Sequence, residues 1–162
     1  MDFTHQELVK KAAEWARSRC DVVFTERSNG FGELPDVMAW SYRWSMLIEC
    51  KVSRTDFLRD KRKPGRALDW GKTWGHEDAV GNFRAYCCPR GLIKDTEIPD
   101  RWMLLEVYPS GFVRLNVNPW KYDIKKTIWW NELTAKALDS ERFMLFRALQ
   151  DIKQGRESKK IL

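Results

Sequence analysis

Long hydrophobic runs are missing from the sequence. A transmembrane helix needs roughly eighteen or more consecutive apolar residues, and no such stretch occurs along the 162 residues. The first residues, "MDFTHQELVKKAAEW", also lack the apolar core of a signal peptide. We therefore expect a cytoplasmic protein that makes no contact with a membrane.

Cysteine and histidine patterns typical of metal sites are missing as well. The two histidines, His5 and His76, are far apart in the sequence, and we expect His5, in the first turn of a predicted helix, at the surface. The cysteines are expected to be reduced and packed as small apolar side chains. They include no CxxC pair, which argues against a zinc site of ordinary spacing: Cys20, Cys50, Cys87 and Cys88.

Charge is abundant, and its sign is unevenly distributed. The net charge is +6, and most of it comes from residues 51–66, "KVSRTDFLRDKRKPGR", where seven basic residues stand against two acidic ones. Such a patch suits the phosphate backbone of a nucleic acid, although a solvated helix face explains the same charges. The candidate contacts are Arg54, Arg59, Lys61, Arg62, Lys63 and Arg66.

Local patterns predict a mixed α/β chain. The hydrophobic fraction of 43% allows a packed core, and the length suggests one domain. Thr4 and Glu7 have the spacing of a capping box, which predicts a helix over 4–18, and a similar pattern at Ser53 predicts a helix that ends before Pro64. β-Branched and aromatic runs predict strands at 21–27, 36–40, 45–52 and 83–89, and a hairpin over 102–117.

The remaining segments carry most of the unassigned aromatic residues. A helix is expected over 140–154, with one apolar face in the core formed by Phe143, Phe146, Leu149 and Ile152. The glycine-containing stretch 64–82 is long for a loop, which is typical of functional or disordered segments. Its Trp70 and Trp74 would either stack on unpaired bases or cover the sheet as a packed flap.

The third predicted strand carries ionisable residues on one face. Because side chains alternate along a strand, Glu49 and Lys51 project together with Leu47, and the opposite, apolar face consists of Met46, Ile48, Cys50 and Val52. Asp36 begins the preceding strand, behind Pro35, at a position where a strand edge tolerates proline. A hairpin between the two strands would bring Asp36 near Glu49, so three ionisable groups are expected to meet.

This combination of groups suits phosphodiester hydrolysis. Two carboxylates and a neighbouring backbone carbonyl form a hard oxygen site suited to Mg²⁺, which keeps several waters. A lysine beside such an ion can orient or help deprotonate a bound water and stabilise developing negative charge. The sequence therefore predicts metal-assisted hydrolysis with Mg²⁺ as the cofactor and Mn²⁺ as its substitute, guided by the adjacent basic segment.

The motif Pro35-Asp36 … Glu49-Cys50-Lys51, with a helix before it and a basic helix after it, resembles the PD-(D/E)XK nuclease superfamily. The stretch "IECKVSRTDFLRDKRKP" is similar to the segment around the catalytic lysine in small phage and bacterial members, including MmcB-like DNA-repair proteins. The resemblance implies an α/β fold with a restriction-endonuclease-like core, an α-β-β-β-α-β mixed sheet flanked by helices, over residues 1–118, with a C-terminal hairpin and helix. Residues 119–162 would pack an aromatic segment and a helix on this core within a single domain.

The resemblance also implies roles for individual residues. By motif position, Asp36, Glu49 and Lys51 would be catalytic, with Asp36 and Glu49 as metal ligands. The backbone carbonyl of Cys50 would be a further ligand. Some members add an acidic residue from the first helix, and Glu14 is the candidate here, because the other glutamate of that helix is explained by capping.

The expected function is that of a Mg²⁺-dependent deoxyribonuclease in DNA processing or repair, in a bacterial cell or a phage-infected host. No separate base-recognition module is evident, so a homodimer or a partner protein would supply specificity. The alternative is a non-catalytic nucleic-acid-binding protein or a phage counter-defence protein that uses the same scaffold.

Overall fold

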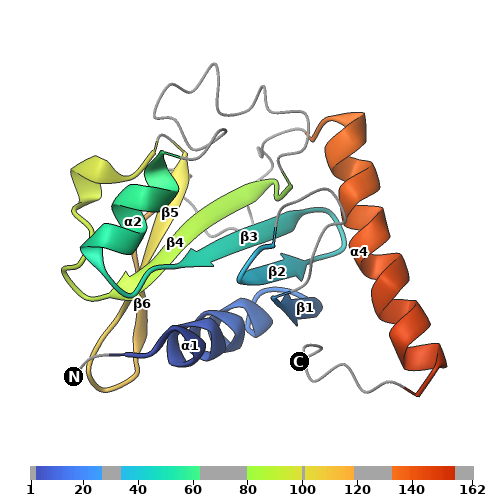
Figure 1. Ribbon diagram of the computed structural model, residues 1–162, viewed down its shortest axis with the longest axis horizontal. Helices are drawn as coiled ribbons and strands as arrows, with labels where there is room; N and C mark the ends of the chain where they lie inside the picture. The colour runs from blue at the N-terminus through green and yellow to red at the C-terminus, as the bar shows by residue number, and fades with distance from the viewer. Residues whose placement is uncertain (1–2, 27–33, 63–79, 100, 119–132, 156–162) are drawn as a thin grey trace.

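The fold is a mixed six-stranded β-sheet flanked by helices (Figure 1). The computed structural model describes residues 3–26, 34–62, 80–99, 101–118 and 133–155. In these ranges the helices are α1 (His5–Arg17), α2 (Arg54–Lys61), the short 3-10 helix η1 (Asp95–Glu97) and α4 (Ala135–Lys153). The strands are β1 (Val22–Thr25), β2 (Val37–Trp40), β3 (Ser45–Cys50), β4 (Phe83–Pro89), β5 (Trp102–Val107) and β6 (Val113–Val117).

Strand order in the sheet follows the chain, β1-β2-β3-β4-β5-β6. The β3–β4 and β4–β5 pairs are parallel and the other three are antiparallel. A parallel step needs a crossover connection, and α2 lies on the one between β3 and β4. The predicted order of helices and strands is confirmed, as are the strand at 83–89 and the hairpin at 102–117. None of the helices in the described ranges is long and apolar enough to cross a membrane.

α1 covers one face of the sheet. The predicted capping box forms its start: the Glu7 N–H donates to Thr4 Oγ1 at 3.3 Å, and the Thr4 N–H donates to Glu7 Oε2 at 2.7 Å. The apolar side of the helix, including Leu8, Ala12 and Trp15, packs in one cluster with strand residues that include Met46, Ile48, Cys50, Phe83 and Ala85. The predicted inward face of the third strand is therefore confirmed.

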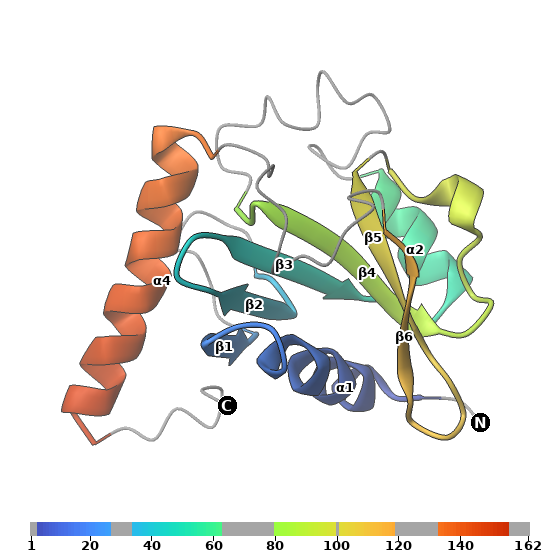
Figure 2. The same ribbon diagram turned by 180° about the vertical axis from the view of Figure 1, so that it is seen from behind.

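The opposite face carries two separate apolar clusters. One packs Met144 and Ala148 of α4 against Leu47. The other packs Phe57 of α2 against Tyr86, with ring centroids 5.2 Å apart and planes at 86°. Figures 1 and 2 show α2 and α4 at opposite ends of the sheet. Buried ionisable side chains lie on the same face as these clusters: Glu49, Lys51 and Arg84.

The C-terminal helix differs from its prediction in two ways. α4 begins at Ala135, five residues earlier than expected, because the Thr134 side chain caps it by accepting the Ala137 N–H at 3.1 Å. The expected core face is wrong, since its side chains are exposed by 39%, 56%, 65% and 59%: Phe143, Phe146, Leu149 and Ile152. The buried side is formed by Ala137, Ser140, Glu141, Met144 and Ala148.

A buried hydrogen-bond network sets which side of α4 packs. Glu141 accepts hydrogen bonds from the Trp40 indole N–H at 2.8 Å, the Ser45 hydroxyl at 2.7 Å and the Gly81 N–H at 2.9 Å. Burial raises the pKa of Glu141, while these donors and the charge of Arg84 act in the opposite direction. Turning the helix would leave these donors without an acceptor, at about 1–3 kcal/mol each.

The Glu141→Gln variant is expected to change stability in a pH-dependent way. Because the folded-state pKa of Glu141 is raised above its usual value of 4.5, its contribution is fully present below that value and is lost as the pH rises through the folded pKa. The free energy of unfolding of the wild type should therefore exceed that of the variant by more at about pH 4 than at about pH 7, as measured by urea denaturation.

Glu7→Gln is a control with the opposite sign. Hydrogen bonds from Thr4 lower the pKa of Glu7, so its contribution is present above the unfolded pKa and is lost as the pH falls through the folded one. The difference between wild type and Glu7→Gln should therefore grow as the pH rises. If the difference in the free energy of unfolding between wild type and Glu141→Gln also grew with pH, burial would not be destabilising the ionised form of Glu141.

Gly81 leaves no room for a side chain beside the start of β4. Its φ is +90°, and a Cβ would lie 2.9 Å from both Leu47 N and Phe83 O. Gly81→Ala is expected to lower the free energy of unfolding by roughly 3 kcal/mol, through backbone strain of about 1–2 kcal/mol and overpacking of about 1–3 kcal/mol. Gly91→Ala is the control, because Gly91 has φ +76° but no atom within 4 Å of its Cβ position. If urea denaturation showed the same loss in the free energy of unfolding for Gly81→Ala and Gly91→Ala, there would be no steric cost at Gly81 beyond that of the backbone angle.

Candidate catalytic site

The structure brings Asp36, Glu49 and Lys51 together at the middle of the sheet. Val37 of β2 pairs with Ile48 of β3, which sets Asp36, just before β2, opposite Glu49. Lys51 directly follows β3, and its Nζ lies 3.2 Å from Glu49 Oε2. This contact confirms that Glu49 and Lys51 project from one face of the strand.

Asp36 is held by two neighbours. Its Oδ2 accepts the Cys50 N–H at 2.7 Å, and its Oδ1 lies 3.2 Å from His5 Nε2. Burial raises the pKa of Asp36 and the charge of Glu49 raises it further, whereas the Cys50 hydrogen bond and the charges of His5 and Lys51 act in the opposite direction. His5 therefore contacts the site and is not the plain surface residue expected from its place in the first turn of α1.

Lys51 is a buried ammonium between two carboxylates. Its Nζ lies 3.2 Å from Glu49 Oε2 and 3.4 Å from Asp60 Oδ1, and the residue is only 4% exposed. Burial by itself would lower the pKa of Lys51, but the charges of Glu49, Asp60 and Asp36 raise it above its usual value. The Lys51 ammonium is thus held between two carboxylates and is suited to stabilise negative charge.

Asp60 is a residue of this group that the sequence analysis did not select. It lies on α2 and is 1% exposed; its Oδ2 accepts the Tyr86 hydroxyl at 2.9 Å, while its Oδ1 faces Lys51. Tyr86 stands opposite Glu49 in the parallel pairing of β3 and β4. The available signal was helical spacing: Asp60 follows Phe57 by three residues and shares its buried side of α2.

Glu14, the additional acidic candidate, lies elsewhere on α1. Its Oε2 is 3.2 Å from Lys11 Nζ, and its side chain is 41% exposed. At 1.5 Å per residue it stands about 13 Å along the helix from His5, the α1 residue that does contact Asp36. The structure therefore brings Asp36, Glu49 and Lys51 together without Glu14.

Arg54, the first of the predicted nucleic-acid contacts, is engaged within the protein. Its guanidinium forms two hydrogen bonds of 2.7 Å with the carboxylate of Glu97 and a third, of 3.1 Å, with the Leu92 carbonyl. The hydrogen bonds that Glu97 accepts from Arg54 and from the Lys94 N–H lower the pKa of Glu97 to about 2. Arg54 thus ties α2 to η1, and a phosphate would have to compete with a bidentate carboxylate for it.

The other described basic candidates, at the C-terminal end of α2, are more open. Arg59 and Arg62 are exposed, and Lys61 is half-buried with its Nζ 5.7 Å from the centroid of the Phe57 ring. Arg59 and Lys61 lie in the last turn of α2, and Arg62 is its C-terminal cap. Four further candidates lie outside the described residues: Lys63, Arg66, Trp70 and Trp74.

The oxygen donors of the site fit a hard divalent cation. Asp36 and Glu49 supply carboxylates, and Cys50 offers only its backbone, because its thiol is buried in the apolar cluster under α1. Burial, and after it the negative charge of Glu49, raises the pKa of Asp36, and a bound cation would offset that charge. In the described ranges, no group of three or more His, Cys, Asp or Glu side chains is placed to hold a metal ion, but Mg²⁺ commonly takes only one or two carboxylates and keeps its waters.

Comparisons with known proteins bear on the fold alone. No family model and no curated protein matches the chain. A solved structure of a protein of unknown function from Silicibacter pomeroyi is similar, with a TM-score of 0.60 and 19% sequence identity over 97% of this chain and 94% of that one. The likeness supports the mixed α/β arrangement.

Asp60→Ala tests the ion pairs around Lys51. Removing one partner of a buried pair leaves charge uncompensated, so the free energy of unfolding should fall by about 3–5 kcal/mol in urea denaturation. Asp139→Ala is the matched control: Asp139 pairs with Arg142 at 3.3 Å, but these side chains are 65% and 82% exposed, so the loss should be small. If the free energy of unfolding fell by a similarly small amount in Asp60→Ala and Asp139→Ala, the charge of Lys51 would not need Asp60 for its compensation.

Proposed function

We propose that the protein is a Mg²⁺-dependent deoxyribonuclease of the PD-(D/E)XK type, with a restriction-endonuclease-like core. The observation that carries the proposal is the convergence of Asp36, Glu49 and Lys51 from adjacent strands. Asp36 stands opposite Glu49, Lys51 contacts Glu49, and α2 is the next helix in the chain. The described order of helix, three strands, helix and strand supports the proposal.

The residues divide the catalytic work by their chemistry. Asp36 and Glu49, with the Cys50 carbonyl, would hold Mg²⁺, which when bound supplies a water of lowered pKa and polarises a phosphate oxygen. The Lys51 ammonium is fixed by Glu49 and Asp60, so it can stabilise negative charge that develops on the phosphate.

Substrate reaches this group from the side of Asp36. Among the described site residues, Glu49 and Lys51 are 5% and 4% exposed, whereas the side chains of Asp36 and His5 are 16% and 39% exposed. The negative charge of a DNA backbone suits the exposed Arg59 in the last turn of α2 and the exposed Arg62 that caps this helix. A phosphodiester at the site would meet the fixed positive charge of Lys51.

The second candidate function is a non-catalytic nucleic-acid-binding or phage counter-defence protein. The near-complete burial of Lys51 between two carboxylates favours it, because such a network also serves as a structural ion pair. On this alternative the basic surface would bind DNA in a salt-dependent way without cutting it. A homodimer or a partner protein that supplies specificity fits either function.

Cleavage assays separate the two. Labelled single-stranded, duplex and branched DNA would be incubated with Mg²⁺, with Mn²⁺ and with chelator. We expect cutting that depends on the metal and that falls about 100-fold or more in Lys51→Met, which keeps the side-chain volume but removes the charge. Asp36→Asn should lose activity as well. Lys11→Ala, a lysine paired with Glu14 on α1, should cut like the wild type.

Other outcomes lead to different conclusions. Salt-sensitive binding of DNA without cutting of any substrate would support the non-catalytic binding protein. Neither binding nor cutting would favour the counter-defence protein, whose partner is a protein. Cutting that persists unchanged in Lys51→Met, with the fold verified by circular dichroism, would refute the assigned catalytic site.

A further inference from the structure

α4 carries a row of apolar side chains on a side that does not pack on the sheet. Single exposed apolar residues are common at protein surfaces, but a contiguous row along one helix marks a surface that meets another molecule. Four members of the row are 47–65% exposed and Leu145 is half-buried. We call this row the α4 stripe: Leu138, Leu145, Phe146, Leu149 and Ile152.

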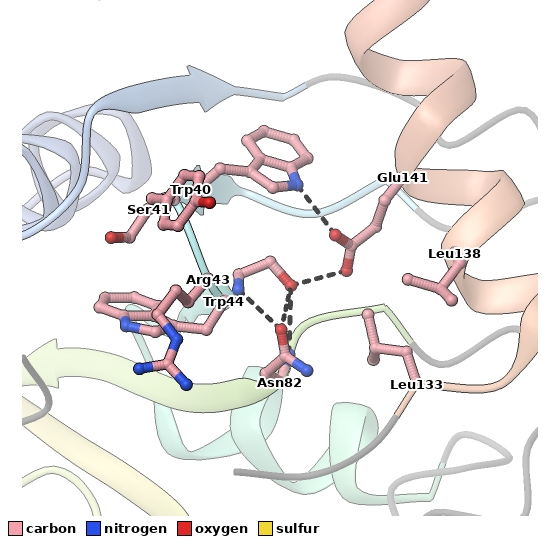
Figure 3. Close-up of a pocket in the computed structure, with 10 residues that line it drawn as sticks. Trp40, Ser41, Arg43, Trp44, Asn82, Leu133, Leu138 and Glu141 are labelled. Atoms are coloured by element: carbon pink, nitrogen blue, oxygen red, sulfur yellow. Dashed lines mark hydrogen bonds between the residues drawn. The ribbon is translucent and has the colours of Figure 1, made fainter. Parts of the chain in front are cut away.

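The buried side of α4 fixes the direction in which the stripe points. Glu141 faces the sheet and accepts hydrogen bonds from Trp40 and Ser45 (Figure 3). With 3.6 residues per turn, the stripe is centred about a third of a turn away from the middle of that buried side. Leu138, at the first end of the stripe, also lines a cavity beside Glu141. The helix therefore cannot turn to bury the stripe without breaking the bonds of Glu141.

The stripe has the spacing of a helix that packs against another helix. Leu138, Leu145 and Ile152 follow one another at intervals of seven residues, and Leu149 comes four residues after Leu145. Alternating steps of three and four residues are the pattern of knobs-into-holes packing between two helices. We expect the occupant to be a helix. The positions that share this spacing form the seam: Ala135, Leu138, Arg142, Leu145, Leu149 and Ile152.

A second copy of α4 in the antiparallel direction fits the seam. A two-fold axis between residues 143 and 144 makes the seam complementary to itself, as a two-fold dimer requires. In this arrangement Arg142 keeps its ion pair with Asp139, at 3.3 Å, whereas a parallel pair would set Arg142 against its own copy, and like charges repel. The facing pairs are Leu138 with Leu149, Arg142 with Leu145, and Ala135 with Ile152.

Charged residues beside the seam suit the same direction. Asp139 and Lys153 are exposed and lie on one flank of the seam, two seven-residue repeats apart. The antiparallel arrangement brings the first half of one helix beside the last half of the other. Asp139 of each copy then lies near Lys153 of the other copy, and opposite charges beside a seam set the direction in which two helices pair.

The size of the stripe indicates a weak dimer. In two copies the exposed parts of its side chains amount to on the order of 1,000 Å², near the lower limit of specific interfaces. Arg142 within the seam also reduces stability, as a charged residue at such a position does, while it favours one arrangement over others. A dissociation constant in the micromolar range is therefore expected.

We propose that the α4 stripe is the contact surface of a homodimer in which two α4 helices pack antiparallel about a two-fold axis. This inference does not depend on the proposed nuclease function. Figures 1 and 2 show α2 at the other end of the sheet from α4, so the contact leaves the exposed Arg59 and Arg62 open to a polyanion.

Sedimentation velocity tests the contact over a range of about 1 to 200 μM, which brackets micromolar affinity. The wild type should pass from monomer to dimer as the concentration rises. Leu149→Lys should weaken the dimer about 100-fold or more, because each dimer loses the leucine twice and gains two charges in the seam. The control is Phe112→Lys, which changes a similarly exposed residue (63%) in the β5–β6 turn and should associate like the wild type.

Charge reversal tests the antiparallel direction. Asp139→Lys and Lys153→Asp should each weaken the dimer about 2- to 30-fold, the effect of losing two exposed ion pairs. The double variant, Asp139→Lys with Lys153→Asp, restores opposite charges and should associate more tightly than either single variant. Equal affinity of the double and the single variants would overturn the antiparallel direction.

The remaining outcomes would overturn the dimer itself, whether or not the protein cuts DNA. One is a monomer at every concentration, and another is a dimer that persists unchanged in Leu149→Lys, with the fold verified by circular dichroism. A monomer that sediments with anionic phospholipid vesicles would assign the stripe to a membrane surface. A monomer in which Leu149→Lys lowers the free energy of unfolding would show that the chain covers its own stripe.

Discussion

The buried ammonium of Lys51 is the interaction on which the candidate site depends. An uncompensated charge in the interior costs several kcal/mol, so Lys51 requires both Glu49 on its own strand and Asp60 on α2. The bond from Tyr86 to Asp60 holds that carboxylate in place. Because α2 also carries the exposed Arg59, and Arg62 caps its C-terminal end, the ion pair of Asp60 helps to fix where this positive surface charge stands.

α2 and α4 lie on the face of the sheet opposite α1, and each is anchored there by a buried carboxylate. Asp60 reaches from α2 to Lys51 and Tyr86, and Glu141 reaches from α4 to Trp40 and the residues around it. A buried carboxylate adds little net stability, but it demands partners at defined positions. The helices are therefore placed by polar contacts as well as by their apolar clusters, and the sheet between them carries Glu49 and Arg84.

The sequence patterns correctly predicted those features of the structure that are set by residues close together in the chain. Alternation along β3 correctly separated Glu49 and Lys51 from the apolar face, and the Thr4–Glu7 spacing correctly marked the start of α1. The contact of His5 with Asp36 was missed because it joins residues far apart in the sequence. Apolar spacing located α4 but named the wrong buried face, since hydrogen bonds of Glu141 to the sheet and not the phenylalanines decide which side packs.

Oxygen atoms of three carboxylates gather around one ammonium in the described part of the candidate site. Glu49, Asp60 and Asp36 all act on Lys51, while His5 Nε2 lies 3.2 Å from Asp36 Oδ1. Burial first, and the negative charge of Glu49 second, raises the pKa of Asp36, the least buried of the three carboxylates. A divalent cation binds oxygen atoms that carry negative charge, and for this reason the metal-dependent function is the one that we propose.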